Sequence, residues 1–337
     1  MKLALHSFDL PLAHPFGISR GTTTVQTTLI VELQQDGLRG FGEATENSYY
    51  GATVENMSGV LERVRPIIEE HSLVDPAAFW ELVHPRLVES TFAQCALDLA
   101  AHDLWGKLRG QPLWRLWGLG IDNLPVTDYT IGIDSIDVMV KKLKEFPDWP
   151  VYKIKLGTRD DLQIIRSLRN HTRAVFRVDA NCAWSAEETV RNSSALAELG
   201  VEFIEQPLAA DDWEGMKRVY RESALPVVAD ESCQVEADVD RCTGYFHGVN
   251  IKLVKCGGLI PARRMIGRAR QLGMKVMVGC MTESTVGISA IAQLLPLLDY
   301  VDMDGALLLG RDIASGVTIS QGRVHYPDEN GCGVRLL

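Results

Sequence analysis

The hydrophobic pattern of residues 1–112 predicts two strands followed by three helices. The stretch TTLIVELQQDGLRGFGEA, residues 27–44, reads as two strands joined through Asp36-Gly37, a favoured hairpin turn. Apolar residues then recur at helical spacing over 53–70, 75–88 and 91–109. Strands followed by helices are typical of an α+β unit, which we expect to form a separate domain over residues 1–112.

After residue 125 the pattern changes to short apolar strands separated by helical stretches. Most of the gaps hold a helical pattern, such as SAEETVRNSSALAELG. The eight predicted strands begin at residues 126, 151, 175, 203, 227, 248, 275 and 300. Alternation of strand and helix indicates a parallel sheet, and eight units predict a closed (β/α)8-type barrel over 113–315. A doubly wound open sheet is the alternative, although no GxGxxG follows the first strand to support it. The final residues, 316–337, read as extended and are expected to return to the N-terminal unit.

Charge and composition exclude several classes of partner. The chain of 337 residues carries a net charge of −10 and contains no basic run, so nucleic acid and anionic membranes are not expected partners. The N-terminus lacks the continuous apolar core of a signal peptide, and ISAIAQLLPLL is too short to span a bilayer. The seven cysteines form no CxxC pair or zinc spacing, which favours a reducing, cytoplasmic location.

Three acidic residues end consecutive predicted strands. Asp179, Glu205 and Asp230 follow apolar runs in FRVDA, FIEQP and VVADE. Each one alone would be explained by a solvated charge or a structural ion pair. In barrel enzymes, however, the active site lies at the C-terminal ends of the strands, where the three carboxylates would converge. Oxygen ligands without His or Cys select Mg²⁺, with Mn²⁺ as the second candidate.

Three lysines are also placed at the barrel mouth by their positions on predicted apolar strands. Lys153 and Lys155 share one face of the second barrel strand, because side chains two apart on a strand point the same way. Lys252 ends the sixth strand, so Lys155 and Lys252 should face each other across the barrel mouth, with the metal strands between them. A lysine near a divalent cation and another lysine should have a lowered pKa and can act as a base near neutral pH. We expect Lys155 and Lys252 to serve as acid and base, and Lys153 to hold a substrate oxygen.

Several motifs give the whole chain a family resemblance. They occur in the order CALDLAAHDLWGKLRGQPLWRLWG, KIKLG, VDANCAW, IEQP, ADES and NIKLVKCGG. On these motifs the chain resembles the enolase superfamily, in its muconate-lactonising-enzyme subgroup, whose sites use a Lys or His base with Mg²⁺. The resemblance implies a (β/α)7β barrel whose mouth is capped by the first domain. It also implies metal ligands at Asp179, Glu205 and Asp230 and bases at Lys155 and Lys252.

The segment YVDMDGAL, residues 300–307, is similar to the Asp-x-Asp segment of the dipeptide epimerases in this subgroup. There the two carboxylates bind the α-ammonium group of the substrate, which implies that role for Asp302 and Asp304. The alternative is a strand-end turn in which both residues cap the next helix. The stretches DYTIGI and VGCMTES match the same enzymes, which places Thr130, Cys280 and Thr282 along the substrate.

Two loops of the first domain are expected to cover the barrel mouth. In PFGISRGTTT, Arg20 is available for a carboxylate on the substrate side chain, although this loop departs from the best-known Ala-Glu epimerase pattern. A solvated loop charge is the alternative for Arg20. In ENSYYGATVENM, Tyr49 and Tyr50 are candidate pocket walls, with plain surface packing as the alternative.

These features together predict a Mg²⁺-dependent epimerase that inverts the α-carbon of the C-terminal residue of an L,L-dipeptide, with L-Ala-L-Glu as the first candidate. One lysine would remove the α-proton and the other would return a proton on the opposite face. The alternatives are an N-acylamino acid racemase, an o-succinylbenzoate synthase, or an inactive barrel that binds only a metal or a partner. A dipeptide is the expected small-molecule partner, and assembly into a homo-oligomer is compatible with the sequence.

Overall fold

The N-terminal part of the chain forms a three-stranded antiparallel sheet. The computed structural model describes residues 1–19 and 21–337. In the sheet, β2 pairs with both of its neighbours, and the strands are β1 (Lys2–Ile18), β2 (Gly21–Gln35) and β3 (Leu38–Thr45). The predicted hairpin is confirmed, because Asp36 and Gly37 adopt φ values of 52° and 77°, as a tight β2–β3 turn requires.

The sequence pattern missed β1. This strand contains Pro11 and Pro15, which cannot donate to a ladder, and its pairing with β2 shifts register between Pro11 and Phe16. Its apolar residues therefore do not alternate regularly along its length. The strand is recognisable only from its long antiparallel pairing with β2.

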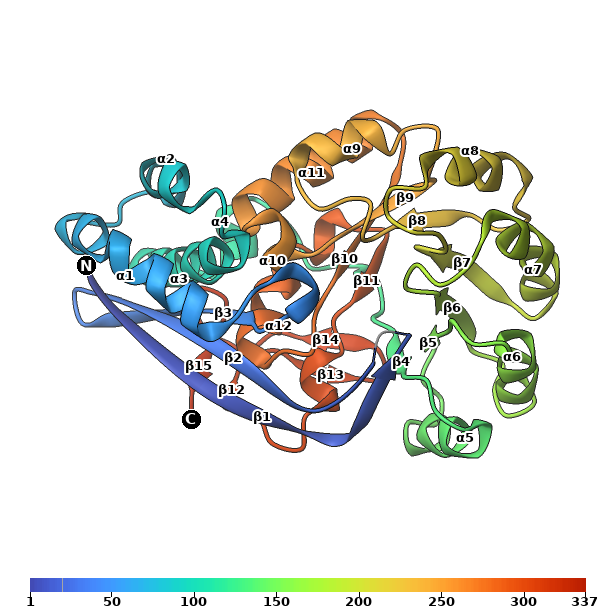
Figure 1. The fold of residues 1–337 in the computed structure, drawn as a ribbon. Coiled ribbons are helices and arrows are strands. Elements are labelled where there is room, and N and C mark those ends of the chain that lie inside the picture. The colour runs from blue at the N-terminus through green and yellow to red at the C-terminus, as the bar shows by residue number, and fades with distance from the viewer. Residues whose placement is uncertain (20) are drawn as a thin grey trace.

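The three predicted helices are present: α1 (Val54–Glu70) and α3 (Thr91–Arg109) pack against the sheet, and α2 (Pro76–Leu87) packs against these two helices (Figure 1). The Thr53 and Asp75 side chains accept backbone N–H groups at the starts of α1 and α2. Gly40 and Gly42 bring β3 against α3: a Cβ on Gly42 would lie 2.0 Å from the carbonyl oxygen of Ala96. Only glycine permits this approach.

The rest of the chain forms an eight-stranded parallel barrel. All eight predicted strands are present and neighbour one another in sequence order: β4 (Tyr129–Ile131), β5 (Val151–Lys155), β6 (Val175–Asp179), β7 (Val201–Glu205), β8 (Val227–Ala229), β9 (Gly248–Ile251), β10 (Lys275–Gly279) and β11 (Tyr300–Asp302). A parallel bridge between Thr127 and Val301 joins the first and last strands. The barrel is thus nearly closed, and the open-sheet alternative is wrong.

Seven of the barrel strands are followed by an α-helix, and β11 is followed only by a 3₁₀-helix. This is the (β/α)7β arrangement that the family resemblance implied. The helices of this part are α4 (Leu113–Leu116), α5 (Ile136–Glu145), α6 (Asp161–Arg169), α7 (Ala186–Glu198), α8 (Trp213–Glu222), α9 (Glu236–Arg241), α10 (Leu253–Cys256), α11 (Leu259–Gln271) and α12 (Thr285–Ala292). The 3₁₀-helices of the chain are η1 (Ser48–Tyr50), η2 (Leu295–Leu297) and η3 (Gly305–Leu308).

The C-terminal segment runs back along the N-terminal domain. It contains the short strands β12 (Ala314–Ser315), β13 (Thr318–Ser320), β14 (Arg323–His325) and β15 (Arg335–Leu336). The Cys332 N–H donates to Asp103 Oδ1 on α3 at 2.8 Å, and Lys107 Nζ on α3 donates to the Val334 carbonyl at 2.9 Å. The domain boundaries at residues 112 and 315 remain predictions.

Two further observations concern the whole described chain. Over residues 1–19 and 21–337, no helix has both the length and the apolar character needed to cross a bilayer. Over the same residues none of the seven cysteines forms a disulfide, and five of them are buried.

The close contact of β3 with α3 yields a test of the packing. Gly42→Ala should lower the free energy of unfolding by ~1–3 kcal/mol or more, because the added methyl group would meet the backbone of α3. Thermal and urea denaturation would measure the loss. Gly59→Ala is the matched control, since its Cβ would meet only Arg63 Nη1, at 3.8 Å, and alanine favours the helix. Equal stability of the two variants would contradict this account of the β3–α3 contact.

Candidate active site

Three buried carboxylates meet at the C-terminal ends of adjacent barrel strands. Asp179 ends β6, Glu205 ends β7, and Asp230 directly follows β8. Oxygen atoms from the three side chains all lie within 4.8 Å of one another. The ladder pairs Asp179 with Glu205 directly. The structure therefore brings together the three residues that the sequence analysis selected as metal ligands.

The electrostatics of this cluster fit a divalent cation. Burial and the charge of Asp179 raise the pKa of Glu205 to about 7. Burial opposes ionisation of Asp179 and Asp230 as well, but Lys155 and Lys153 keep the pKa of Asp179 below its usual value, and Lys252 and Lys255 do the same for Asp230. Three converging carboxylates supply the hard oxygen donors that Mg²⁺ prefers, and their mutual repulsion would be relieved by its charge.

Lys155 and Lys252 lie on either side of the carboxylate strands. Lys155 is on β5 and Lys252 follows β9, and β6, β7 and β8 run between these two strands. Lys155 Nζ lies 2.7 Å from Asp179 Oδ2, and Lys252 Nζ lies 2.8 Å from Asp230 Oδ2. Both side chains line the same cavity. The structure thus places two ammonium groups at that cavity, each paired with a different carboxylate.

Neighbouring carboxylates raise the pKa of two of the lysines. Burial alone would lower the pKa of Lys252, but Asp230 outweighs it and the pKa is raised. The pKa of Lys153 is likewise raised well above its usual value, despite burial, by Asp302, Glu205 and other carboxylates. The lowered lysine pKa that we expect beside a divalent cation stays a prediction.

Lys153 lies among buried carboxylates, and its expected contact with a substrate oxygen stays a prediction. Its side chain is 1% exposed and lies outside the cavity lining. Its Nζ lies 2.7 Å from Asp302 Oδ2, 2.8 Å from Glu205 Oε2 and 3.4 Å from Asp179 Oδ2. Lys153 therefore links the metal carboxylates to the acidic pair at the end of β11.

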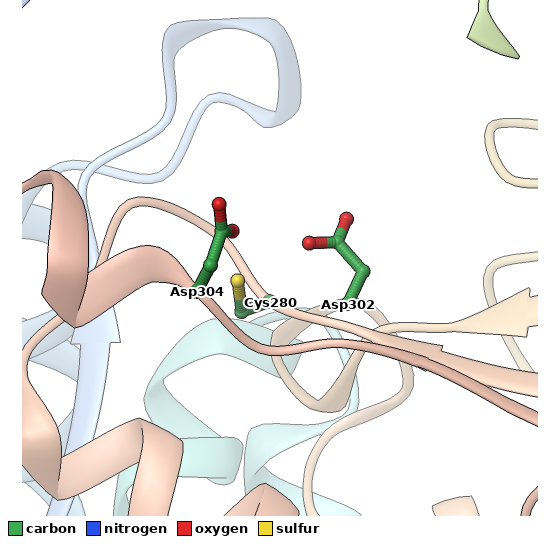
Figure 2. A group of neighbouring side chains, drawn as sticks. All are labelled: Cys280, Asp302 and Asp304. Carbon is green, nitrogen blue, oxygen red and sulfur yellow. The ribbon is translucent and has the colours of Figure 1, made fainter. Parts of the chain in front are cut away.

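Asp302 and Asp304 lie together at the end of β11. Figure 2 shows both carboxylates and the Cys280 thiol pointing to the same side of the chain, and atoms of the three lie within 4.8 Å of one another. Asp304 occupies the N-cap position of η3, but its side chain does not cap that helix. It accepts hydrogen bonds instead from the Thr130 backbone N–H at 2.5 Å and from Thr130 Oγ1 at 3.2 Å. The helix-capping alternative is therefore wrong for Asp304.

The two aspartates have opposite pKa shifts. Burial and Asp302 raise the pKa of Asp304 to about 8. Burial opposes ionisation of Asp302, but Lys153 and Lys155 hold its pKa at about 2. Oδ1 of Asp302 is buried without a hydrogen-bond partner. A cationic ligand group at this end of the cavity would supply a donor to that oxygen and relieve the repulsion between the two side chains.

A cavity of about 170 Å³ connects these groups. Besides the two lysines and the aspartate pair, it is lined by all three residues that the sequence placed along the substrate, Thr130, Cys280 and Thr282. Tyr50 lines it too, whereas Tyr49 is not part of the lining and is 48% exposed. Arg20 falls outside the described residues.

Sequence reasoning missed several wall residues, because they lie in the N-terminal domain or in loops after barrel strands. These are Phe16, Ile18, Thr23, Gln26, Thr45, Glu46, Asn47, Asn181, Glu231, Met281 and Leu308. Six of them lie between residue 16 and residue 46, on β1, β2, β3 and the residue that follows β3. Their position over the barrel mouth depends on how the two domains pack, which local periodicity does not reveal.

Two residues that hold the metal carboxylates were also missed. Lys255 Nζ lies 2.5 Å from Asp230 Oδ1 and also donates to the Asp230 and Cys233 carbonyls. Asn250 Nδ2 donates to Glu205 Oε1 at 2.8 Å. A signal existed for Asn250: it lies two residues before Lys252 near the end of β9, so the two side chains point to the same face.

Comparison with known proteins assigns the chain to a family. Residues 3–118 match the mandelate racemase / muconate lactonizing enzyme N-terminal domain, and residues 139–337 match the enolase C-terminal domain-like family. The chain is 59% identical over 337 residues to the L-Ala-D/L-amino acid epimerase of Flavobacterium johnsoniae, covering 100% of both chains.

Solved structures agree with the sequence match. The L-Ala-D/L-Glu epimerase from Bacillus subtilis, in a substrate-liganded complex, superposes with a TM-score of 0.94 at 28% identity, covering 99% of both chains. The dipeptide epimerase from Methylococcus capsulatus, complexed with Mg and the dipeptide L-Arg-D-Lys, has a TM-score of 0.89 at 33% identity, again over 99% of both chains. The chain therefore belongs to the mandelate racemase and muconate lactonizing enzyme family of the enolase superfamily.

Proposed function

We propose that this protein is a Mg²⁺-dependent dipeptide epimerase. The observation that carries the proposal is the Asp302–Asp304 pair, which shares one cavity with both candidate bases and with Asp230, one of the three clustered candidate metal carboxylates. An N-acylamino acid racemase or an o-succinylbenzoate synthase acts on a substrate without a free α-ammonium group, so it would gain nothing from this pair. The relative named L-Ala-D/L-amino acid epimerase, at 59% identity, and the structure named dipeptide epimerase, at 33% identity, also support the proposal.

In the proposed mechanism Asp179, Glu205 and Asp230 would hold the cation, with Asn250 and Lys255 fixing the orientation of Glu205 and Asp230. The cation would neutralise negative charge that develops on the substrate's C-terminal carboxylate as its neighbouring α-carbon loses a proton. Lys155 and Lys252 would lie on opposite faces of that α-carbon. One of them would remove the proton and the other would deliver a proton from the opposite face.

The opposite end of the cavity would bind the substrate's ammonium group. Asp302 and Asp304 would accept hydrogen bonds from it, and Thr130 would hold Asp304 in place. We take an L,L-dipeptide of the L-Ala-L-Glu type as the first candidate. The Flavobacterium relative named for L-Ala-D/L-amino acids favours alanine, or a similarly small residue, at the N-terminal position. Seven cysteines without a disulfide in the described chain favour a cytoplasmic location.

The metal assignment predicts the effect of removing single carboxylates. Asp179→Asn, Glu205→Gln and Asp230→Asn should each abolish turnover and weaken Mg²⁺ binding, because each removes one of three charges that balance the cation. Calorimetric Mg²⁺ titration and an epimerisation assay would measure both effects. Asp211→Asn, at an exposed carboxylate, is the control and should behave as wild type. Full activity of the EDTA-treated enzyme would refute the metal assignment.

The ammonium site predicts a substrate-dependent loss. Asp304→Asn should remove a charge-assisted hydrogen bond worth ~1.5–3 kcal/mol, a loss of about 10- to 100-fold in kcat/KM for free dipeptides. N-acetylated dipeptides should be affected far less. Asp302→Asn should reduce turnover of both classes, because Asp302 also contacts Lys153. Equal losses for both classes in Asp304→Asn would mean that Asp304 is structural. Turnover of N-succinyl amino acids without turnover of free dipeptides would overturn the proposed function.

The two-base arrangement predicts a separation of proton exchange from epimerisation. Lys155→Ala and Lys252→Ala should each stop inversion, because one face of the α-carbon then lacks a proton donor. The remaining lysine should still exchange the α-hydrogen of one epimer with D₂O while its configuration is retained. The two variants should prefer opposite epimers, with Lys252 serving the L,L form and Lys155 the L,D form. NMR or mass spectrometry would detect the exchange, slowed by about 10²–10⁴-fold. Exchange of the same epimer by both variants would exclude the two-base mechanism.

A further inference from the structure

Glu43 is a fully buried carboxylate between the N-terminal domain and the barrel, and the proposed chemistry does not use it. It lies on β3 and is 0% exposed. Its carboxylate accepts hydrogen bonds from Ser284 Oγ at 2.6 Å, from the backbone N–H groups of Ser284 and Gly287, each at 3.0 Å, and from Thr28 Oγ1 at 2.9 Å. Three of these four bonds reach residues more than 240 positions away in the sequence.

The backbone of β3 fixes the direction of the Glu43 side chain. Side chains alternate across a strand, so Glu43 points away from the face that carries Gly40 and Gly42. Those two glycines approach α3 so closely that a Cβ would lie within 2.4 Å of a carbonyl oxygen of α3 at either position. Because β3 is pressed against α3 in this way, Glu43 has little freedom to move relative to the N-terminal domain.

On the barrel side, Glu43 binds the N-terminus of α12. The first N–H groups of a helix lack partners within the helix, and a negative charge there is favourable. Ser284 is the N-cap of α12, and its hydroxyl both accepts from Val286 N–H and donates to Glu43. Gly287 leaves no room for a side chain, since a Cβ would lie 2.3 Å from Glu283 Oε2. Glu43 therefore completes the N-terminus of a barrel helix from another domain.

Both ends of this connection continue directly into the cavity wall. On the N-terminal side, residues 45–47 follow Glu43 and line the cavity. On the barrel side, residues 280–282 precede Ser284 and line the same cavity, with Cys280 beside the Asp302–Asp304 pair. Asn47 Nδ2 also approaches Met281 Sδ, at 3.9 Å. The carboxylate of Glu43 thus joins two wall segments at the end of the cavity where the ammonium group would bind.

We propose that Glu43 is a positioning residue that holds residues 45–47 of the N-terminal domain against residues 280–284 of the barrel, and so sets the binding of the substrate's N-terminal residue. This inference rests on the proposed function for the identity of the substrate. The connection between the two segments does not depend on the proposed function. Glu43 touches none of the reacting groups, so its loss should affect binding rather than the transfer of protons.

The direct test is Glu43→Gln. The amide keeps the size of the side chain but loses the charge. Its NH₂ group would replace one carboxylate oxygen, and it would face N–H or O–H groups that donate to that oxygen in the wild type. Because a buried donor would then lack a partner, we expect KM for free dipeptides to rise about 10-fold, with kcat within about 2-fold of wild type. Mg²⁺ affinity should not change. Amide hydrogen exchange at residues 284–287 should become faster.

Asp98 supplies a matched control. It is a buried carboxylate on α3 of the N-terminal domain, and it accepts the Leu259 N–H at the start of α11 at 2.6 Å. Asp98→Asn therefore removes the charge from the same kind of contact between domain and helix, at a helix whose start does not line the cavity. It should lower the melting temperature and speed amide exchange at residues 259–260, and KM should remain that of wild type.

A milder variant covers the case in which Glu43→Gln fails to fold. Ser284→Ala removes the 2.6 Å hydroxyl bond to Glu43 and the N-cap bond from the Val286 N–H, and it leaves both backbone donors to Glu43. It should raise KM in the same direction by a smaller factor. An unchanged KM in a folded Glu43→Gln or Ser284→Ala variant, or an equal KM rise in Asp98→Asn, would overturn the inference. Absence of dipeptide turnover in the wild type would instead contradict the proposed function. In that case, faster amide hydrogen exchange in Glu43→Gln, confined to residues 284–287, would still show that Glu43 connects the two segments.

Discussion

The structure depends on a balance of buried charge at the barrel mouth. Four carboxylates, Asp179, Glu205, Asp230 and Asp302, are paired with four lysines, Lys153, Lys155, Lys252 and Lys255. Burying one unpaired charge costs several kcal/mol, so each sign is retained only because the other is present. Removing Asp230 would leave both Lys252 and Lys255 without a carboxylate partner, and removing Asp179 would do the same to Lys155. The barrel supplies the geometry that holds the two sets in register.

The same pairing gives the lysines two different kinds of task. Lys153 and Lys255 are fully buried and each contacts several acceptors, so they act as fixed counter-charges. Lys155 and Lys252 line the cavity and each contacts one carboxylate oxygen. In the proposed function Asp179 and Asp230 would hold the cation, which would compete with Lys155 and Lys252 for the same two carboxylates. Each lysine would then be available to the substrate.

Sequence reasoning predicted the barrel and the charged residues well, for a physical reason. A charged residue at the end of an apolar strand can be recognised in the sequence. Parallel strands then bring all of their C-terminal ends to the same edge of the barrel. β1 was missed because Pro11 and Pro15 disturb its alternation. The cavity wall from the N-terminal domain and the role of Glu43 depend on contacts between segments about 240 residues apart, which leave no local pattern. The close contacts of Lys153 and Lys252 with carboxylates, which raise the pKa of both lysines, likewise depend on distances that the sequence does not show.

A crystal structure with Mg²⁺ and an unreactive dipeptide analogue tests the central claim most directly. The account predicts one oxygen each from Asp179, Glu205 and Asp230 at ~2.0–2.1 Å from the cation. Lys155 and Lys252 should have left their carboxylates and should lie on opposite faces of the α-carbon of the C-terminal residue, with the ammonium group at Asp302 and Asp304. A cation bound elsewhere, or both lysines still paired as they are here or placed on one face of the ligand, would contradict it.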